Sequence, residues 1–162
     1  MPAKQWIERL ELQPHPEGGF YKRTYCSEGV FAGVIDRDPF PAGRPWAASI
    51  FYLMEAGDFS SFHRIKSDET WHFYAGGPME LFILKDPDRL ETIRMGQGEQ
   101  LQIVVPANHW FAAAPIEGAN YCLMGCTLSP GFDFRDHDMA RADELISLYP
   151  EQADTIRRYC RH

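Results

Sequence analysis

Eight short runs of β-prone residues follow one another through the middle of the chain, with turn sequences between them. The runs are residues 46–54, 59–65, 69–74, 79–84, 91–95, 101–105, 110–113 and 121–128. Turn formers such as Gly57-Asp58, Gly76-Gly77-Pro78 and Asp86-Pro87 separate them. Because no helical stretch lies between consecutive runs to carry a parallel crossover, the pattern predicts a mainly β fold, an antiparallel sandwich or barrel.

Helical periodicity is confined to the two ends of the chain. Apolar residues recur at three- and four-residue steps after Pro2, which predicts a short amphipathic helix that ends before Pro14. Near the C-terminus a similar pattern predicts one helix capped by Asp138 and a second that opens at Pro150. The Pro- and Gly-rich stretch 32–45 is interpreted as a long loop.

Charge and length restrict the partners and the domain count. Sixteen Lys and Arg residues against 23 Asp and Glu give a net charge of −7. Without a basic patch, a nucleic acid or an anionic membrane is an improbable partner. No apolar stretch reaches the length of a membrane span and the N-terminus has no signal-peptide core, so we expect a soluble, cytoplasmic protein. The length of 162 residues suits a single domain spanning 1–162.

One segment, 57–76, carries the strongest motif. Gly57 is followed by His63, Glu69 and Gly76, an arrangement that resembles the first motif of the cupins, where a glycine turn precedes His-x-His, a Glu and a closing glycine. Ile65 stands at the place of the second histidine. In the segment that resembles the second cupin motif, 106–111, Phe111 stands at the place of the last histidine.

Further segments extend the resemblance over nearly the whole chain. They are His15-Pro16-Glu17-Gly18-Gly19-Phe20-Tyr21, 49–53, 68–76, Pro130-Gly131-Phe132-Asp133-Phe134 and 144–150. Together they resemble a family of small single-domain cupins of unknown function. The resemblance implies a cupin jelly-roll β-barrel with a short N-terminal helix and two C-terminal helices, a homodimer, and an architecture similar to that of deoxysugar-nucleotide epimerases.

The motif leaves metal binding open. Of the four expected ligands only His63 and Glu69 stand at the family positions, and two protein ligands seldom hold a divalent ion well. His109 shares strand parity with Phe111 and is the candidate third ligand, whereas His72 is expected to face the other side of its strand. No cofactor is therefore certain, and a divalent metal ion on His63, Glu69 and His109 remains an alternative.

The same residues suggest acid–base chemistry. An imidazole beside a carboxylate inside a barrel is oriented and made more basic, which favours His63 as a base with Glu69 as its orienting partner. Tyr21, Tyr52 and His109 are alternatives for the partner acid. The candidate ligand-binding residues are a turn carboxylate, side chains of the expected barrel strands and aromatic rings suited to stacking: Glu17, Tyr21, Ser49, Phe51, Trp71, Phe73 and His109.

Three functional hypotheses follow. The first is an isomerase or epimerase that acts on a small polar, carbohydrate-like metabolite through His63 and Glu69. The second is a small-molecule binding protein that uses the same pocket without chemistry. The third is a metal-dependent cupin enzyme.

Overall fold

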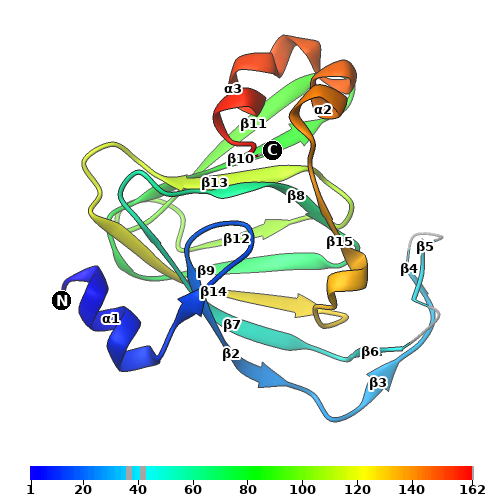
Figure 1. The fold of residues 1–162 in the computed structure, drawn as a ribbon. Helices are drawn as coiled ribbons and strands as arrows, with labels where there is room; N and C mark the ends of the chain where they lie inside the picture. Colours follow the sequence, from blue (N-terminus) through cyan, green and yellow to red (C-terminus); the bar gives the residue numbers. More distant parts are fainter. Residues whose placement is uncertain (36–37, 41–42, 162) are drawn as a thin grey trace.

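Two antiparallel sheets face each other in the computed structural model, which describes residues 1–35, 38–40 and 43–161 (Figure 1). The first sheet has the order β1 (Gln13–Pro14), β2 (Phe20–Cys26), β7 (Ala48–Glu55), β14 (Tyr121–Ser129), β9 (Asp68–Gly76) and β12 (Gln102–Val105). The second has the order β11 (Arg89–Met95), β10 (Met79–Lys85), β13 (Phe111–Pro115), β8 (Ser60–Ile65) and β15 (His137–Met139). The mainly β jelly-roll class predicted from the sequence is confirmed.

The stretch expected to be a long loop contains two short ladders. Strands β3 (Val30–Phe31) and β6 (Arg44–Pro45) pair, as do β4 (Val34–Ile35) and β5 (Asp38–Pro39). They form an arm that extends to one side of the barrel (Figure 1). The part of the loop prediction that falls on 36–37 and 41–42 lies outside the described residues.

The helices are short and lie at the chain ends. They are α1 (Ala3–Leu10), α2 (Ala142–Leu148) and α3 (Ala153–Arg158), with 3-10 turns η1 (Phe134–Asp136) and η2 (Pro150–Gln152). The prediction that Asp138 caps a helix is wrong, because Asp138 lies in β15 and its carboxylate accepts a hydrogen bond from Arg64 at 2.9 Å. Pro150 opens its turn as expected.

No described helix has the length and apolar character that crossing a membrane requires.

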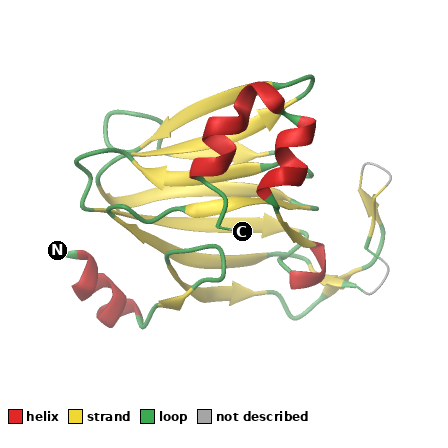
Figure 2. Cartoon of the chain, turned by 45° about the horizontal axis from the view of Figure 1, so that its top comes forward, coloured by secondary structure: helices red, strands yellow, loops and turns green. Residues whose placement is uncertain are grey.

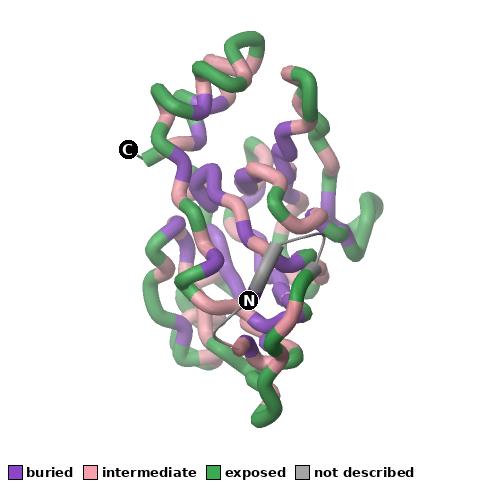
Figure 3. Tube along the Cα trace, turned by 90° about the vertical axis from the view of Figure 1, so that its right-hand side faces the viewer, coloured by how far each residue is buried: buried purple, intermediate pink, exposed green. Residues whose placement is uncertain are grey.

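The main core lies between the two sheets. Tyr52, Met54 and Trp71 from the first sheet meet Leu81 and Phe111 from the second, and each is at most 2% exposed. In Figure 3 buried segments lie mainly in the middle of the molecule and exposed segments mainly at its periphery. The interior of the barrel is therefore mostly side-chain filled.

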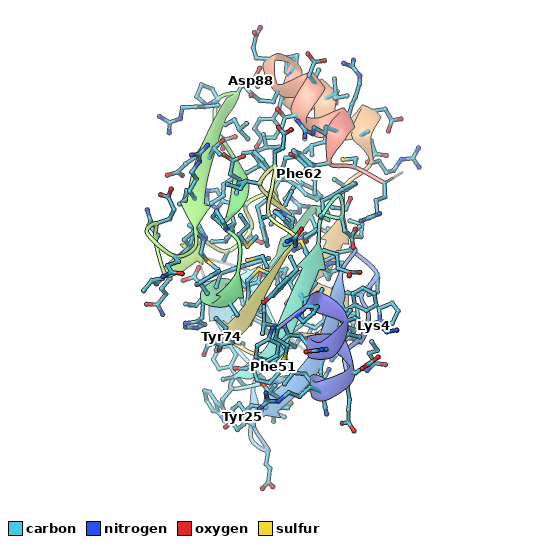
Figure 4. The ribbon with its side chains drawn as sticks, turned by 90° about the vertical axis from the view of Figure 1, so that its left-hand side faces the viewer. Lys4, Tyr25, Phe51, Phe62, Tyr74 and Asp88 are labelled. Carbon is cyan, nitrogen blue, oxygen red and sulfur yellow. The ribbon has the colours of Figure 1, made fainter. Side chains whose placement is uncertain are left out.

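Helices cover the outer faces of both sheets. Helices α2 and α3 lie over the second sheet, where Phe62 and Tyr159 belong to one buried cluster (Figure 2). Helix α1 packs on the first sheet around Leu53, and Phe51 points to this side, close to α1 and Tyr74 (Figure 4). Both faces of these strands are consequently apolar, and strand parity alone does not identify the inner face.

A buried ion pair joins the arm to the segment before β15. The guanidinium of Arg44 in β6 donates to both carboxylate oxygens of Asp136, with an Nη2–Oδ1 distance of 2.8 Å, and both side chains are at most 5% exposed. Asp136 directly precedes His137. The pair therefore fixes the start of β15 against an element more than 90 positions away in the sequence.

We expect Arg44→Met to lower the free energy of unfolding by about 3 kcal/mol or more, because it leaves the Asp136 carboxylate buried without its partner. The matched control is Arg94→Met, which removes a partly exposed cross-strand pair with Glu80 and should cost less than about 1 kcal/mol. Urea unfolding of both variants measures the difference. Equal losses in the two variants would contradict the role of the buried pair.

Candidate functional site

The turn between β1 and β2 delivers a carboxylate to the barrel. Gly18 and Gly19 adopt positive φ angles of 119° and 69°, and a Cβ on Gly18 would lie 2.1 Å from the Phe59 carbonyl oxygen, so the turn requires glycine there. The Glu17 carbonyl accepts hydrogen bonds from the Ser61 backbone N–H and from Nε of Arg161, each at 3.0 Å. The turn is thereby held against β8 and the C-terminal segment.

The Glu17 carboxylate, 5% exposed as a residue, lies among polar side chains from β8 and β15. Oε1 lies 2.6 Å from Nε2 of His137, and Oε2 accepts the Ser60 hydroxyl at 2.9 Å. Nε2 of His63 lies 3.5 Å from Oε2. Ser60 and His63, three residues apart, reach the same carboxylate because the β8–β13 register shifts between them.

Burial and charge set the protonation of this cluster. Burial alone would raise the pKa of Glu17, but His63 and His137, together with His15, lower it to about 2. Burial lowers the pKa of His63 and of His15, and the charge of Glu17 only partly opposes this. Nδ1 of His63 lies 2.8 Å from the Ser61 carbonyl oxygen, so the proton of the neutral ring sits on Nδ1 and donates to that carbonyl. The Nε2 lone pair then faces Glu17.

A second carboxyl group, that of Glu69 in β9, has a pKa that is shifted in the opposite direction from the pKa of Glu17. The residue is 6% exposed, and its Oε2 atom has no hydrogen-bond partner among the described residues. Burial, reinforced by the negative charge of Glu17, raises the pKa of Glu69 to about 8, while Trp71 and Cys126 oppose the shift. At neutral pH Glu69 is therefore protonated and Glu17 is ionised.

Both carboxyl groups line one cavity of about 40 Å³ inside the barrel. Its walls combine a few polar groups with aromatic and aliphatic side chains. The lining residues are His15, Glu17, Tyr21, Arg23, Ala48, Ile50, Tyr52, Ile65, Glu69, Trp71, Leu128, Phe132 and Phe134.

The structure brings together some of the residues singled out in the sequence. Glu17, Tyr21, Glu69 and Trp71 all line the cavity. His63 does not line the cavity, and its Nε2 atom lies 3.5 Å from the Glu17 carboxylate. The expected contact between Glu69 and His63 is not found among the described residues: the carboxylate within 3.5 Å of Nε2 of His63 is that of Glu17.

Four of the sequence-derived ligand-binding residues lie away from the cavity wall. Ser49 Oγ hydrogen-bonds Thr127 Oγ1 at 2.9 Å, and Phe51 packs with the α1 cluster. Phe73 packs against the inter-sheet core, and His109 lies before β13 with Nδ1 3.0 Å from the Ala107 carbonyl oxygen.

Sequence reasoning did not identify two histidines of the site, His15 and His137, as functional residues. His15 stands in the His-Pro-Glu-Gly-Gly segment, whose spacing to Glu17 was a usable signal. His137 lies in a three-residue strand in a segment that was predicted to lead into a helix. Only the pairing of β15 with β8, which sets His137 opposite Ile65, places it beside His63.

Three of these side chains have the composition of a metal site. Ligand atoms of Glu17, His63 and His137 all lie within 4.8 Å of one another. Two imidazoles and one carboxylate form a donor set that divalent transition metals accept. The Nδ1–H bond from His63 to a backbone carbonyl is the support that metal-binding histidines usually have, so these residues fit a metal ion.

Comparison with known proteins gives a consistent family match. The family model described as "Cupin superfamily (DUF985)" matches residues 4–140. Among solved structures, a protein of Shewanella oneidensis is 32% identical with a TM-score of 0.87, and the match covers 99% of this chain and 98% of that one. A hypothetical protein from Leishmania major is also 32% identical, with a TM-score of 0.88 and full coverage of both chains.

More distant structures share the fold. Oxalate decarboxylase from Bacillus subtilis is 12% identical with a TM-score of 0.56, over 90% of this chain and 36% of that one. A cupin 2 domain-containing protein from Halorhodospira halophila is 15% identical with a TM-score of 0.53, over 88% and 83%. No curated protein matches the chain.

We expect Glu69→Gln to change the pH dependence of stability. The folded protein keeps the Glu69 proton up to about pH 8, while the unfolded chain loses it near the ordinary pKa of 4.5, so the free energy of unfolding falls as pH rises through that interval. Glutamine has no such proton. Relative to the unmodified protein, the variant should gain a few kcal/mol of stability between pH 5 and 8.5.

Urea unfolding at a series of pH values measures this gain. Glu80→Gln is the control, because Glu80 lies in a partly exposed ion pair on β10. Parallel stability curves for Glu69→Gln and the unmodified protein would show that Glu69 is not protonated in the folded state.

Proposed function

Since the chain belongs to the cupin family described as "Cupin superfamily (DUF985)", we propose that its barrel cavity binds a small polar metabolite and isomerises or epimerises it by proton transfer. The observation that supports this most directly is the pair of buried carboxyl groups that line one cavity, whose surroundings lower the pKa of Glu17 to about 2 and raise the pKa of Glu69 to about 8. Two titratable groups held in opposite states are the arrangement that general acid–base chemistry requires.

Each carboxyl group has one role. Glu17 accepts a proton from a hydroxyl-bearing carbon next to a carbonyl group, and Glu69 donates its proton to the carbonyl oxygen, which gives a neutral enediol. Return of the two protons, one to carbon on the other face or at the neighbouring position, completes an epimerisation or isomerisation without a net change in atoms or electrons. The steps need no oxidant or reductant.

The imidazoles behind Glu17 support its part in this exchange. A carboxylate with a low pKa holds an added proton poorly, so a neighbouring base must share the proton. Nε2 of His63 is an acceptor 3.5 Å from Glu17 and serves that purpose, while the bond from His137 keeps the carboxylate in place. His63 thus keeps its proposed function as a base, acting through Glu17.

A second candidate function is metal-dependent catalysis, favoured by the grouping of Glu17, His63 and His137. A divalent ion held there would act as a Lewis acid that polarises a substrate carbonyl or activates water. In this case Glu17 would be a ligand, and Glu69 would remain the proton donor on the cavity wall.

The homodimer expected from the family resemblance stays a prediction.

Deuterium exchange tests the proton-transfer function. We expect the protein to introduce solvent deuterium next to the carbonyl group of at least one member of a panel of small sugars, sugar phosphates and hydroxy or oxo acids, followed by proton NMR in D2O. Glu17→Gln and Glu69→Gln should each slow this exchange at least about 100-fold, the usual contribution of a positioned acid or base.

Glu80→Gln, away from the cavity, is the control and should exchange at the unmodified rate. If deuterium exchange continues at the unmodified rate in both cavity variants, the assignment of Glu17 as the base and Glu69 as the acid is contradicted. Ligand-induced stabilisation with no exchange would favour the non-catalytic binding protein.

Elemental analysis of protein purified without a polyhistidine tag tests the metal-dependent function. This second candidate predicts about one equivalent of a transition metal, lost in His137→Ala and in Glu17→Gln, because each removes one of three ligands. His109→Ala is the control: it removes the third ligand expected from the sequence and should leave the metal content unchanged. Less than a few tenths of an equivalent in the unmodified protein would exclude this candidate.

A further inference from the structure

One cavity residue is used by neither candidate mechanism. Arg23 lies on β2, two residues after Tyr21, and both side chains line the cavity. The intervening Lys22 points away and pairs with Glu11 near α1. Arg23 is exposed, and it forms no ion pair or hydrogen bond with the residues that the structure describes.

The charge of Arg23 has no counterpart on the cavity wall. Only two of the lining residues are acidic. Glu17 already accepts hydrogen bonds from His137 and Ser60, and Glu69 is held in its uncharged form. Among the described lining residues, Arg23 is thus the one permanent cation, in a chain whose net charge is −7.

The strand pairing places Ile50 of β7 beside Arg23 and, two strands further across the sheet, Trp71 of β9. Aliphatic and aromatic side chains such as Ile50, Leu128 and Phe132 line the cavity. Among the described residues, Oε2 of Glu69 and Nε1 of Trp71 are buried without a hydrogen-bond partner, although Trp71 lies close enough to Glu69 to lower its pKa. Because buried polar groups are nearly always paired in native proteins, a polar ligand group that reaches this end of the cavity would supply the missing hydrogen bonds.

We propose that the ligand of this cavity is a small organic anion whose carboxylate or phosphate group binds the guanidinium of Arg23, with its uncharged polar end directed to Glu69 and Trp71. The planar fork of an arginine matches either oxyanion with two parallel hydrogen bonds. The assignment of Glu69 to the reacting end rests on the proposed function. The anion site itself rests on Arg23 and its unpaired charge.

Binding of simple probes tests the anion site without any turnover. The probes are benzoate and phenyl phosphate, with benzamide as the neutral analogue of the same shape, titrated calorimetrically at fixed ionic strength. We expect the better of the two anions to bind at least 10-fold more tightly than benzamide. Arg23→Gln should weaken anion binding at least 10-fold, and Arg23→Lys, which keeps the charge but not the fork, should lie between.

The matched control is Arg89→Gln, an exposed strand arginine on β11 that does not line the cavity. It should leave the affinity for both anions unchanged. Because Arg23 is exposed, Arg23→Gln should fold normally, which circular dichroism checks. Whichever anion binds more tightly identifies the group, carboxylate or phosphate, that the ligand carries.

Three results would overturn the proposal: benzamide binding as tightly as both anions, no saturable binding of either anion, or an equal loss in Arg23→Gln and Arg89→Gln, which would indicate unspecific charge attraction. The proposed function fails on different grounds. An anion site that depends on Arg23 in a protein without deuterium exchange would keep this inference and remove the proton-transfer function.

Discussion

The buried carboxylate of Glu17 is the interaction on which the candidate site depends. An ionised carboxylate inside a barrel is costly unless hydrogen bonds replace the water it loses. Here His137 and Ser60 supply them, and His63 lies within 3.5 Å. These partners come from β8 and β15, so a single charge links the β1–β2 turn to two strands of the opposite sheet.

Two arginines far away in the sequence hold this arrangement in place. Arg161 donates to the Glu17 and Phe59 carbonyls and pairs with Asp58, so the C-terminal segment fixes the turn that carries the carboxylate. Arg44 binds Asp136, the neighbour of His137, and fixes the other side of the cluster. Preorganisation of the site thus rests on contacts that span more than 90 residues, which explains why so short a strand as β15 can present a histidine accurately.

The difference between what sequence reasoning found and what it missed follows from the range of the interactions. All eight β runs became strands, because turn residues and β-prone runs are local signals. The motif likewise identified His63 and Glu69 as residues of the site region. The inner face was harder to assign, since helices cover both sheets from outside and make Phe51 as apolar a position as Tyr52. His137 depends on a strand pairing that leaves no local pattern.

The two carboxyl groups show how one residue type acquires two states inside one barrel. Glu17 is surrounded by imidazoles and a hydroxyl group and stays charged, whereas Glu69 faces an apolar wall and keeps its proton. The Glu17 carboxylate keeps its negative charge, but His137 and Ser60 already donate hydrogen bonds to it, and Glu69 adds no second charge. An anion that enters past Arg23 therefore meets a single buried carboxylate whose hydrogen bonds are already made. The difference in protonation state between Glu17 and Glu69 suits acid–base chemistry. The same difference leaves one negative charge in the cavity instead of two, which also favours an anionic ligand.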